Sequence, residues 1–84
     1  MDHYYFHLQG GEAYPDTKGT KLESLDAAKH MAVQYIAEYL CHKPQNFWKN
    51  ETCEVRVTDG ADLTLLVVSM IATLSPAIGV QRSL

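Results

Sequence analysis

The stretch SLDAAKHMAVQYIAEYL, residues Ser24 to Leu40, decides the fold, because it is the clearest helix in this sequence of 84 residues. Ser24 is a good N-cap, and Asp26 places a negative charge in the first turn, where the helix dipole favours it. Pro44 is expected to end the helix, because the residue before a proline is driven out of the α region. One apolar stripe follows the helical repeat and is predicted to face the core: Leu25, Ala28, Ala32, Tyr35, Ile36, Tyr39 and Leu40.

Upstream of the helix, the aromatic segment from His3 to Gln9 has the residue types of a β-strand. Its alternation places Tyr4, Phe6 and Leu8 on the core face. Gly10-Gly11 interrupts this strand, and residues 15–19 supply a proline, an aspartate and a glycine, which are typical of turns. We therefore expect a hairpin with a short second strand around residues 20–22.

Downstream of the helix, a polar loop is expected over residues 45–52, followed by an alternating strand from Cys53 to Thr58. Asp59-Gly60 is a hairpin signal. The last strand, about Leu63 to Met70, is apolar on both faces, which predicts burial from both sides. These elements predict an α+β fold of the order ββαββ, with one amphipathic helix packed on one face of a small antiparallel sheet. Residues 1–84 are expected to form a single domain, with a core over about 3–70 and a tail over 71–84 that either contacts a dimer partner or is disordered.

Composition argues against several classes of function. Seven Lys and Arg against ten Asp and Glu give a formal net charge of −3, and the basic residues are scattered, so nucleic acid is not an expected partner. The N-terminus does not resemble a signal peptide, which favours the cytoplasm and reduced thiols for Cys41 and Cys53. Leu63 to Val80 lacks charge, but polar residues, Pro76 and Gly79 interrupt it, so a membrane span is not expected.

The chemistry-bearing residues are poorly spaced for catalysis. His3 and His7 stand about 13 Å apart on one strand, and His30 and His42 about 18 Å apart on the helix. Neither pair can share one metal ion, and no cofactor motif is present. Cys53 lies on an inward strand face, and Cys41 lies near the helix C-terminus, whose dipole disfavours a thiolate. We therefore expect neither a metal, a cofactor nor an enzymatic activity.

Three groups of residues remain as candidate surfaces. Phe47-Trp48 stands out in a polar stretch, either as a cap on the core or as a contact anchor for a partner. The last strand offers an apolar interaction surface with Leu66, Val68 and Met70. On the outer face of the sheet, Tyr5, His7 and Arg56 form a candidate ligand site.

Several segments together resemble a known family: residues 4–8 (YYFHL), 16–19 (DTKG), 25–28 (LDAA) and 54–59 (EVRVTD). In order and spacing they are similar to a bacterial, mostly alphaproteobacterial, family of small proteins of unknown function that open with a Y-F-F-H-L-like strand. The resemblance runs from about His3 to Met70. It implies the hairpin-helix-hairpin order and a cytoplasmic setting, and it implies no mechanism.

Three hypotheses follow for the function. The first is a non-enzymatic protein-interaction module that acts as a homodimer, since a strand that is apolar on both faces needs a cover. The second is a regulatory or antitoxin-like protein that binds an unidentified protein partner. The third is a small-molecule binder that uses the outer sheet face with Tyr5, His7 and Arg56.

Overall fold

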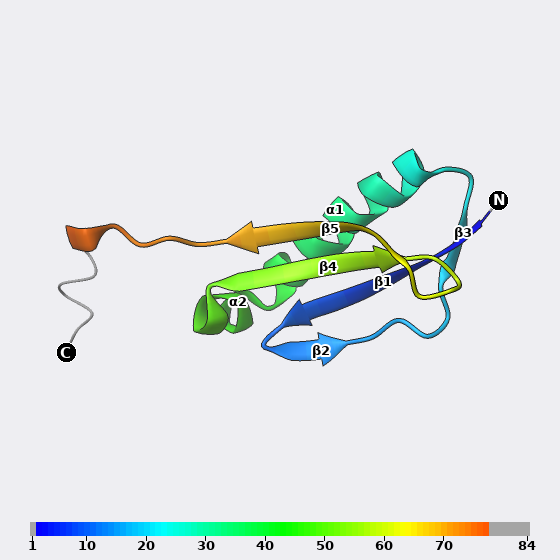
Figure 1. Ribbon diagram of the computed structural model, residues 1–84. Coiled ribbons are helices and arrows are strands. Elements are labelled where there is room, and N and C mark those ends of the chain that lie inside the picture. The colour runs from blue at the N-terminus through cyan, green and yellow to red at the C-terminus, as the bar shows by residue number, and fades with distance from the viewer. Residues whose placement is uncertain (1, 78–84) are drawn as a thin grey trace.

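The computed structural model describes residues 2–77 and shows one layer of strands with both helices on the same side (Figure 1). The α+β class, the antiparallel sheet and the packing of the long helix on one sheet face confirm the prediction. The elements in chain order are β1 (Asp2–Gly10), β2 (Glu12–Tyr14), β3 (Thr20–Leu22), α1 (Leu25–His42), α2 (Pro44–Asn50), β4 (Thr52–Thr58) and β5 (Thr64–Ile71).

The sheet has the order β2-β1-β4-β5, and every pairing is antiparallel. The first hairpin differs from the prediction because two short strands, not one, return along β1. β2 pairs with the end of β1 from Leu8 to Gly10, and β3 pairs with its start from Asp2 to Tyr4. Between them the chain leaves the sheet as a turn, and the Asp16 carboxylate accepts the Phe6 backbone N–H in place of a strand partner.

The core lies between the sheet and the helices, and the predicted alternation of β1 fills its centre. The side chain of Ser24 accepts the backbone N–H of Ala27 at 3.2 Å, which confirms the predicted N-cap. Two members of the predicted apolar stripe, Leu25 and Tyr35, remain 41% and 37% exposed. The buried apolar residues are Tyr4, Phe6, Leu8, Ala28, Ala32, Ile36, Tyr39, Phe47, Cys53, Val55 and Val57.

The predicted loop over residues 45–52 was wrong, because most of it forms the helix α2. Pro44 ends α1 as expected, but it also begins α2, where its fixed φ and missing N–H suit the first helical turn. The turn from α2 into β4 passes through Glu51, which has a positive φ of 60°. The short helix turns Phe47 into the core.

The prediction that the last strand is buried from both sides was also wrong. β5 lies at the edge of the sheet, and most of its residues are exposed. The helices cover only the inner face of the sheet, and no other described element covers the outer face or the free edge of β5 (Figure 1). After Ile71 the chain continues beyond the sheet as far as Ala77, and the remainder of the predicted tail, residues 78–84, lies outside the described residues.

Candidate functional site

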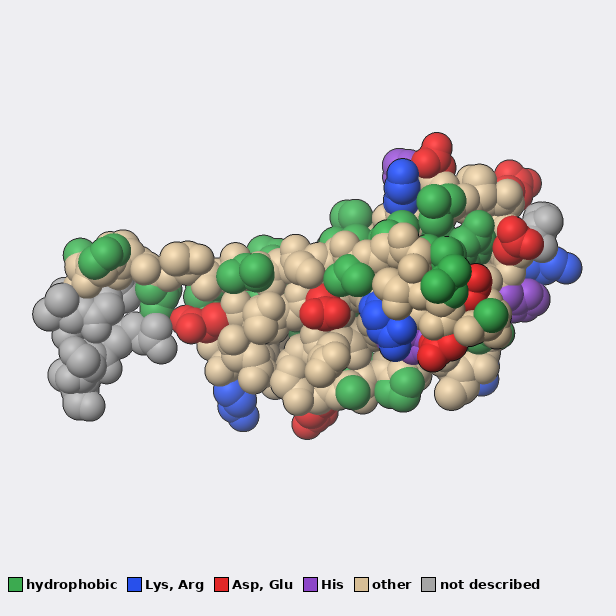
Figure 2. Space-filling view, in the orientation of Figure 1, with side chains coloured by type: hydrophobic (Ala, Val, Ile, Leu, Met, Phe, Trp, Pro, Cys, Tyr) green, Lys and Arg blue, Asp and Glu red, His purple; other side chains and the backbone are tan. Residues whose placement is uncertain are grey.

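β5 presents apolar side chains on both faces of an edge strand. Leu66 and Val68 are half-buried against the core, and Met70 follows them on the same inner face with 46% exposure. Figure 2, seen from the outer face, shows hydrophobic side chains along β5 among polar ones. The exposed outer-face residues of β5 include Val67 and Ile71, of which Ile71 is 71% exposed. Leu65 is 38% exposed and lines a pocket with Tyr4 and Leu25 on the helix side.

The direction of the β5 backbone groups follows from one hydrogen bond at its end. The Ala72 N–H donates to the Glu51 carbonyl at 2.9 Å, so this pair is of the hydrogen-bonded kind. Hydrogen-bonded pairs recur at every second residue of an antiparallel ladder, which assigns Leu66, Val68 and Met70 to the bonds with β4. The N–H and C=O groups of the alternate residues therefore point to the open edge: Val67, Ser69 and Ile71. The regular alternation ends at Leu65, where the register shifts between Val57 and Thr58.

The structure separates the two aromatic residues that the sequence placed side by side. Phe47 is 5% exposed and belongs to the core, whereas Trp48 is 56% exposed. Their rings meet edge-to-face at 5.5 Å between centroids, so Phe47 holds one side of the indole. α2 packs on α1, β1 and β4 and makes no contact with β5, so Trp48 forms a surface separate from that strand.

Tyr5, His7 and Arg56 lie on the outer face of the sheet, as predicted. His7 and Arg56 are direct cross-strand partners, and Tyr5 is opposite Thr58. Arg56 donates to the Thr64 hydroxyl at 3.2 Å and lies 4.0 Å from an Asp62 oxygen. The sheet thus brings the three residues together, and binding of a ligand by them stays a prediction.

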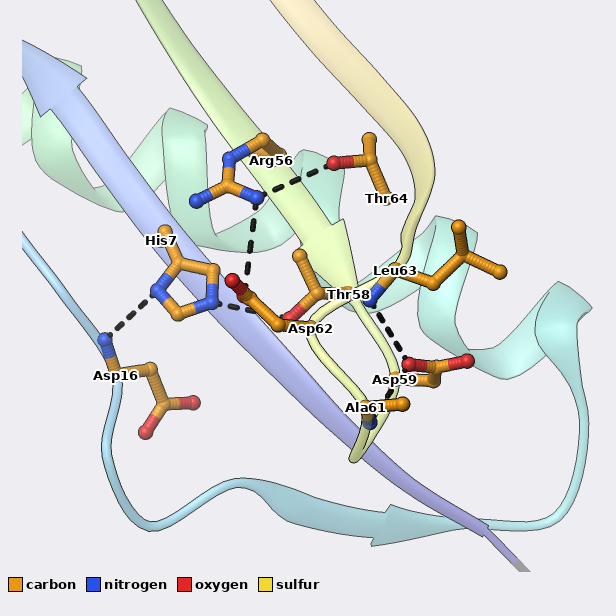
Figure 3. A network of polar contacts seen from close by, with 9 residues as sticks. All are labelled: His7, Asp16, Arg56, Thr58, Asp59, Ala61, Asp62, Leu63 and Thr64. Atoms are coloured by element: carbon orange, nitrogen blue, oxygen red, sulfur yellow. Dashed lines mark hydrogen bonds and ion pairs between the residues drawn. The ribbon is translucent and has the colours of Figure 1, made fainter.

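Both nitrogens of His7 are engaged, as Figure 3 shows. The Asp16 backbone N–H donates to His7 Nδ1 at 3.1 Å, and His7 Nε2 lies 3.0 Å from Thr58 Oγ1. Because Nδ1 accepts, the neutral ring carries its proton on Nε2 and donates to the threonine. Thr58 is only 1% exposed, although it lies on the outer face. In this arrangement His7 links β4 to the turn after β2 and has no nitrogen free to act as a base.

The Asp16 carboxylate organises that turn. One oxygen accepts the backbone N–H groups of Lys18 and Gly19, each at 3.0 Å, and the other accepts that of Phe6 at 3.1 Å. Burial acts to raise the Asp16 pKa, but the bonds from Gly19, Phe6 and Lys18, with a contribution from His7, outweigh it and hold this pKa below its ordinary value. Sequence reasoning recognised Asp16 as a turn residue but missed its link to β1, which only the folded hairpin creates.

The thiols lie as predicted, with Cys53 buried and Cys41 exposed. Burial raises the pKa of Cys53, so its thiol stays protonated. Within residues 2–77, no group of three or more histidine, cysteine, aspartate or glutamate side chains is arranged to hold a metal ion. Nor does this part of the chain contain a helix long and apolar enough to cross a membrane.

Sequence reasoning missed an aromatic cleft between the end of α1 and β2. The cleft has a volume of about 330 Å³, and Tyr14, Tyr35 and Tyr39 form its walls. The Tyr39 hydroxyl donates to the Gly10 carbonyl at 3.3 Å, and the Tyr14 hydroxyl donates to Glu12 at 2.7 Å. The hydrogen bond to Glu12, with some burial, raises the pKa of Tyr14. No spacing in the sequence signals this cluster, because its tyrosines come from two distant elements.

These features define a small two-layer α+β domain with an exposed apolar strand at one edge of the sheet and an aromatic cleft beside β2 at the other edge. The family model of a domain of unknown function, DUF6894, matches residues 3–72, and the chain belongs to that family. The match ends one residue beyond β5 and includes every helix and strand but the first residue of β1. No match was found among curated proteins or among solved structures.

Proposed function

We propose that this domain is a non-enzymatic protein-interaction module that forms a homodimer through the edge of β5, in the cytoplasm of a bacterium. The observation that carries the dimer is an eight-residue edge strand with outward-pointing backbone groups, apolar side chains on both faces and no charge. The cytoplasmic and bacterial setting rests on the sequence resemblance.

An edge of this kind is unusual for a chain that works alone. Exposed strand edges pair readily with other chains, and monomeric proteins protect them with lysines, prolines, bulges or very short strands. The opposite edge follows this rule, because β2 and β3 have only three residues each. β5 has eight residues and contains no lysine or proline, and the register shift in its pairing with β4 is confined to one end, at Val57 and Thr58. Its composition therefore supports a cover supplied by another chain.

A second copy fits this edge better than a charged partner does. Strands related by a two-fold axis place residues near the centre opposite their own kind, so a charge there would face a like charge. The sequence from Leu63 to Val80 has no charged residue. Self-pairing therefore brings no like charges together along β5.

The direction of the backbone groups limits the registers of this pairing, and we propose the one centred on Val68. With Val68 opposite Val68 of the second copy, the outward residues Val67 and Ser69 face each other and form hydrogen bonds. On the inner face, this register places Leu66 opposite Met70 of the second copy. The inner-face apolar residues of β5 thus meet one another across the interface.

Light scattering coupled to size-exclusion chromatography tests the proposal. The protein at tens of micromolar is expected to have the mass of a dimer. Val67→Pro removes an outward N–H that makes no bond to β4, so this variant is expected to be a folded monomer. The matched control Val67→Ala also removes the valine side chain but keeps the backbone N–H, and it is expected to remain dimeric. Circular dichroism confirms the fold of both variants. A monomeric parent protein, or a Val67→Pro variant that dimerises as well as Val67→Ala, would contradict the proposal.

A further inference from the structure

The aromatic cleft beside β2 already holds one cation of the protein itself. The Lys43 ammonium lies 5.5 Å from the centroid of the Tyr14 ring, within the range of a cation–π interaction. Lys43 is the C-cap residue of α1, and its side chain is exposed. The face of the Tyr14 ring thus binds a positive charge. That charge belongs to the long, exposed side chain of Lys43, which a ligand can displace.

The other walls extend the same surface. The rings of Tyr14 and Tyr39 lie 6.3 Å apart at an angle of 58°, and Tyr35 also lines the cleft. Tilted aromatic faces around a small space are the arrangement that recognises ammonium groups, because each ring face carries partial negative charge. Leu8 adds an apolar contact from β1 for the methyl or methylene groups of such a ligand.

The fixed charges around the cleft favour a cation over an anion. Glu38 lines the cleft, and Glu12 accepts the hydrogen bond of the Tyr14 hydroxyl. The C-terminal end of α1, which has a partial negative charge, also meets the cleft at His42. Lys43 is the one lysine or arginine among the lining residues of this described cleft, and it competes for the same ring face.

We infer that this cleft binds a small organic cation with an alkylammonium head, which takes the place of Lys43 against Tyr14 and lies between the three tyrosines near Glu38. The cleft is at the β2 side of the sheet, away from β5, so the inference stands independently of the proposed dimer. Lys43 then acts as an internal competitor, and its removal is expected to strengthen ligand binding. An anion site would respond in the opposite way.

The test is an NMR titration of the intact protein that follows the tyrosine ring signals, with choline as the probe. Its uncharged isostere 3,3-dimethylbutanol and the anion benzoate serve as comparisons. Choline is expected to shift the signals of Tyr14, Tyr35 and Tyr39 with millimolar affinity, and the isostere is expected to bind about fivefold more weakly, since one solvent-exposed cation–π contact has about that effect. Benzoate is expected to cause no saturable shift.

Variants then separate the cation site from a general apolar groove. Lys43→Gln is expected to bind choline about fivefold more tightly, whereas Lys49→Gln, which removes the same charge from α2, leaves the affinity unchanged. Tyr14→Leu and Tyr35→Leu are each expected to weaken binding about fivefold, with unchanged signals from β4 confirming the fold. Equal affinity for choline and its isostere, saturable benzoate binding lost in Lys43→Gln, or the absence of any shift at tens of millimolar choline would each overturn the inference.

Discussion

The Ala72 N–H donates to the Glu51 carbonyl at 2.9 Å, immediately after the last residue of β5. This bond sets the phase of the β4–β5 ladder from Ile71 back to Leu66, because backbone groups in an antiparallel pair alternate in direction. It places Val68, opposite the fully buried Val55, among the residues bonded to β4. The same phase turns the peptide groups of Val67 and Ser69 toward the free edge, and it makes the proposed dimer specific enough to test at single residues.

Cysteine cross-linking tests the register. In a Cys41→Ser background, Val68→Cys is expected to form a disulfide with the second copy under mild oxidation, because directly opposed residues of a non-hydrogen-bonded pair have Cα atoms about 4.5 Å apart. Non-reducing electrophoresis measures the covalent dimer. Val67→Cys, one residue away, is the matched control, and little cross-linking is expected because its own counterpart is not opposite.

A mixture experiment completes this test. Leu66→Cys and Met70→Cys are each expected to cross-link poorly alone, and to form a mixed disulfide when combined. If light scattering shows a dimer but Val68→Cys does not cross-link, the register is wrong while the interaction module stands. Efficient cross-linking of Val67→Cys instead would indicate a shifted pairing.

Phe47 and Trp48 provide a second prediction, because adjacent aromatic residues have opposite environments. Phe47→Ala opens a cavity in the core and is expected to lower the free energy of unfolding by about 3–5 kcal/mol. Trp48→Ala removes a ring that is 56% exposed, and the free energy of unfolding is expected to change by less than about 1 kcal/mol. Urea denaturation followed by circular dichroism measures both, and similar losses in the two variants would contradict the separation of their roles.

The sequence predicted the parts of this fold that depend on local chemistry. Ser24 begins α1 because its side chain caps the helix, and β1 buries Phe6 because alternation decides which face it occupies. The prediction of the fold failed where one sequence pattern is compatible with two different structural environments. Pro44 was interpreted only as the end of a helix, although a proline suits the start of the next one equally well. β5 was interpreted as buried because an apolar strand inside a domain has the same composition as an edge that another chain covers.

The candidate sites show a further limit of sequence reasoning. Tyr5, His7 and Arg56 could be placed on one face, because period-two alternation fixes the face. The partners of His7 could not be predicted, since Thr58 is 51 residues away and Asp16 reaches it through a backbone N–H. Tyr14 and Tyr39 likewise meet only because Gly11 reverses the chain into β2.

Gly11 is the basis of a third prediction. It has a φ of +91°, and a Cβ at this position would overlap the side chain of Asn50, which donates to the Gly10 carbonyl at 3.2 Å. Gly11→Ala is therefore expected to lower the free energy of unfolding by about 1–3 kcal/mol. Gly60→Ala is the control, because a Cβ there meets nothing within 4 Å, and its effect is expected to stay within about 0.5 kcal/mol. Thermal unfolding of the two variants compares them directly.

The link between His7 and Thr58 predicts an energetic coupling. His7→Phe leaves the buried Thr58 hydroxyl without its imidazole partner, and Thr58→Val removes the hydroxyl itself. If the bond stabilises the fold, the loss of unfolding free energy in the double variant is expected to be about 1 kcal/mol smaller than the sum of the losses in the two single variants. Additive losses in a denaturation cycle would show that His7 stabilises the domain only through packing and Asp16.

Asp16 predicts how stability depends on pH. Its folded pKa lies below the value in the unfolded chain, so the carboxylate contributes stability above the unfolded pKa, and this contribution is lost as the pH falls through the folded pKa. At pH 7, Asp16→Asn is expected to lower the free energy of unfolding by about 1–2 kcal/mol, toward the low end because Asp16 is partly exposed. The matched control is Asp26→Asn, because the Asp26 carboxylate forms an exposed ion pair with Lys29 at 3.7 Å and is expected to contribute little stability.

Denaturation at a series of pH values measures the difference in unfolding free energy between Asp16→Asn and the parent protein. This difference is expected to shrink as the pH is lowered below about 4, the ordinary range of an aspartate in an unfolded chain. A difference that stays constant across this range would show that the Asp16 charge does not stabilise the turn.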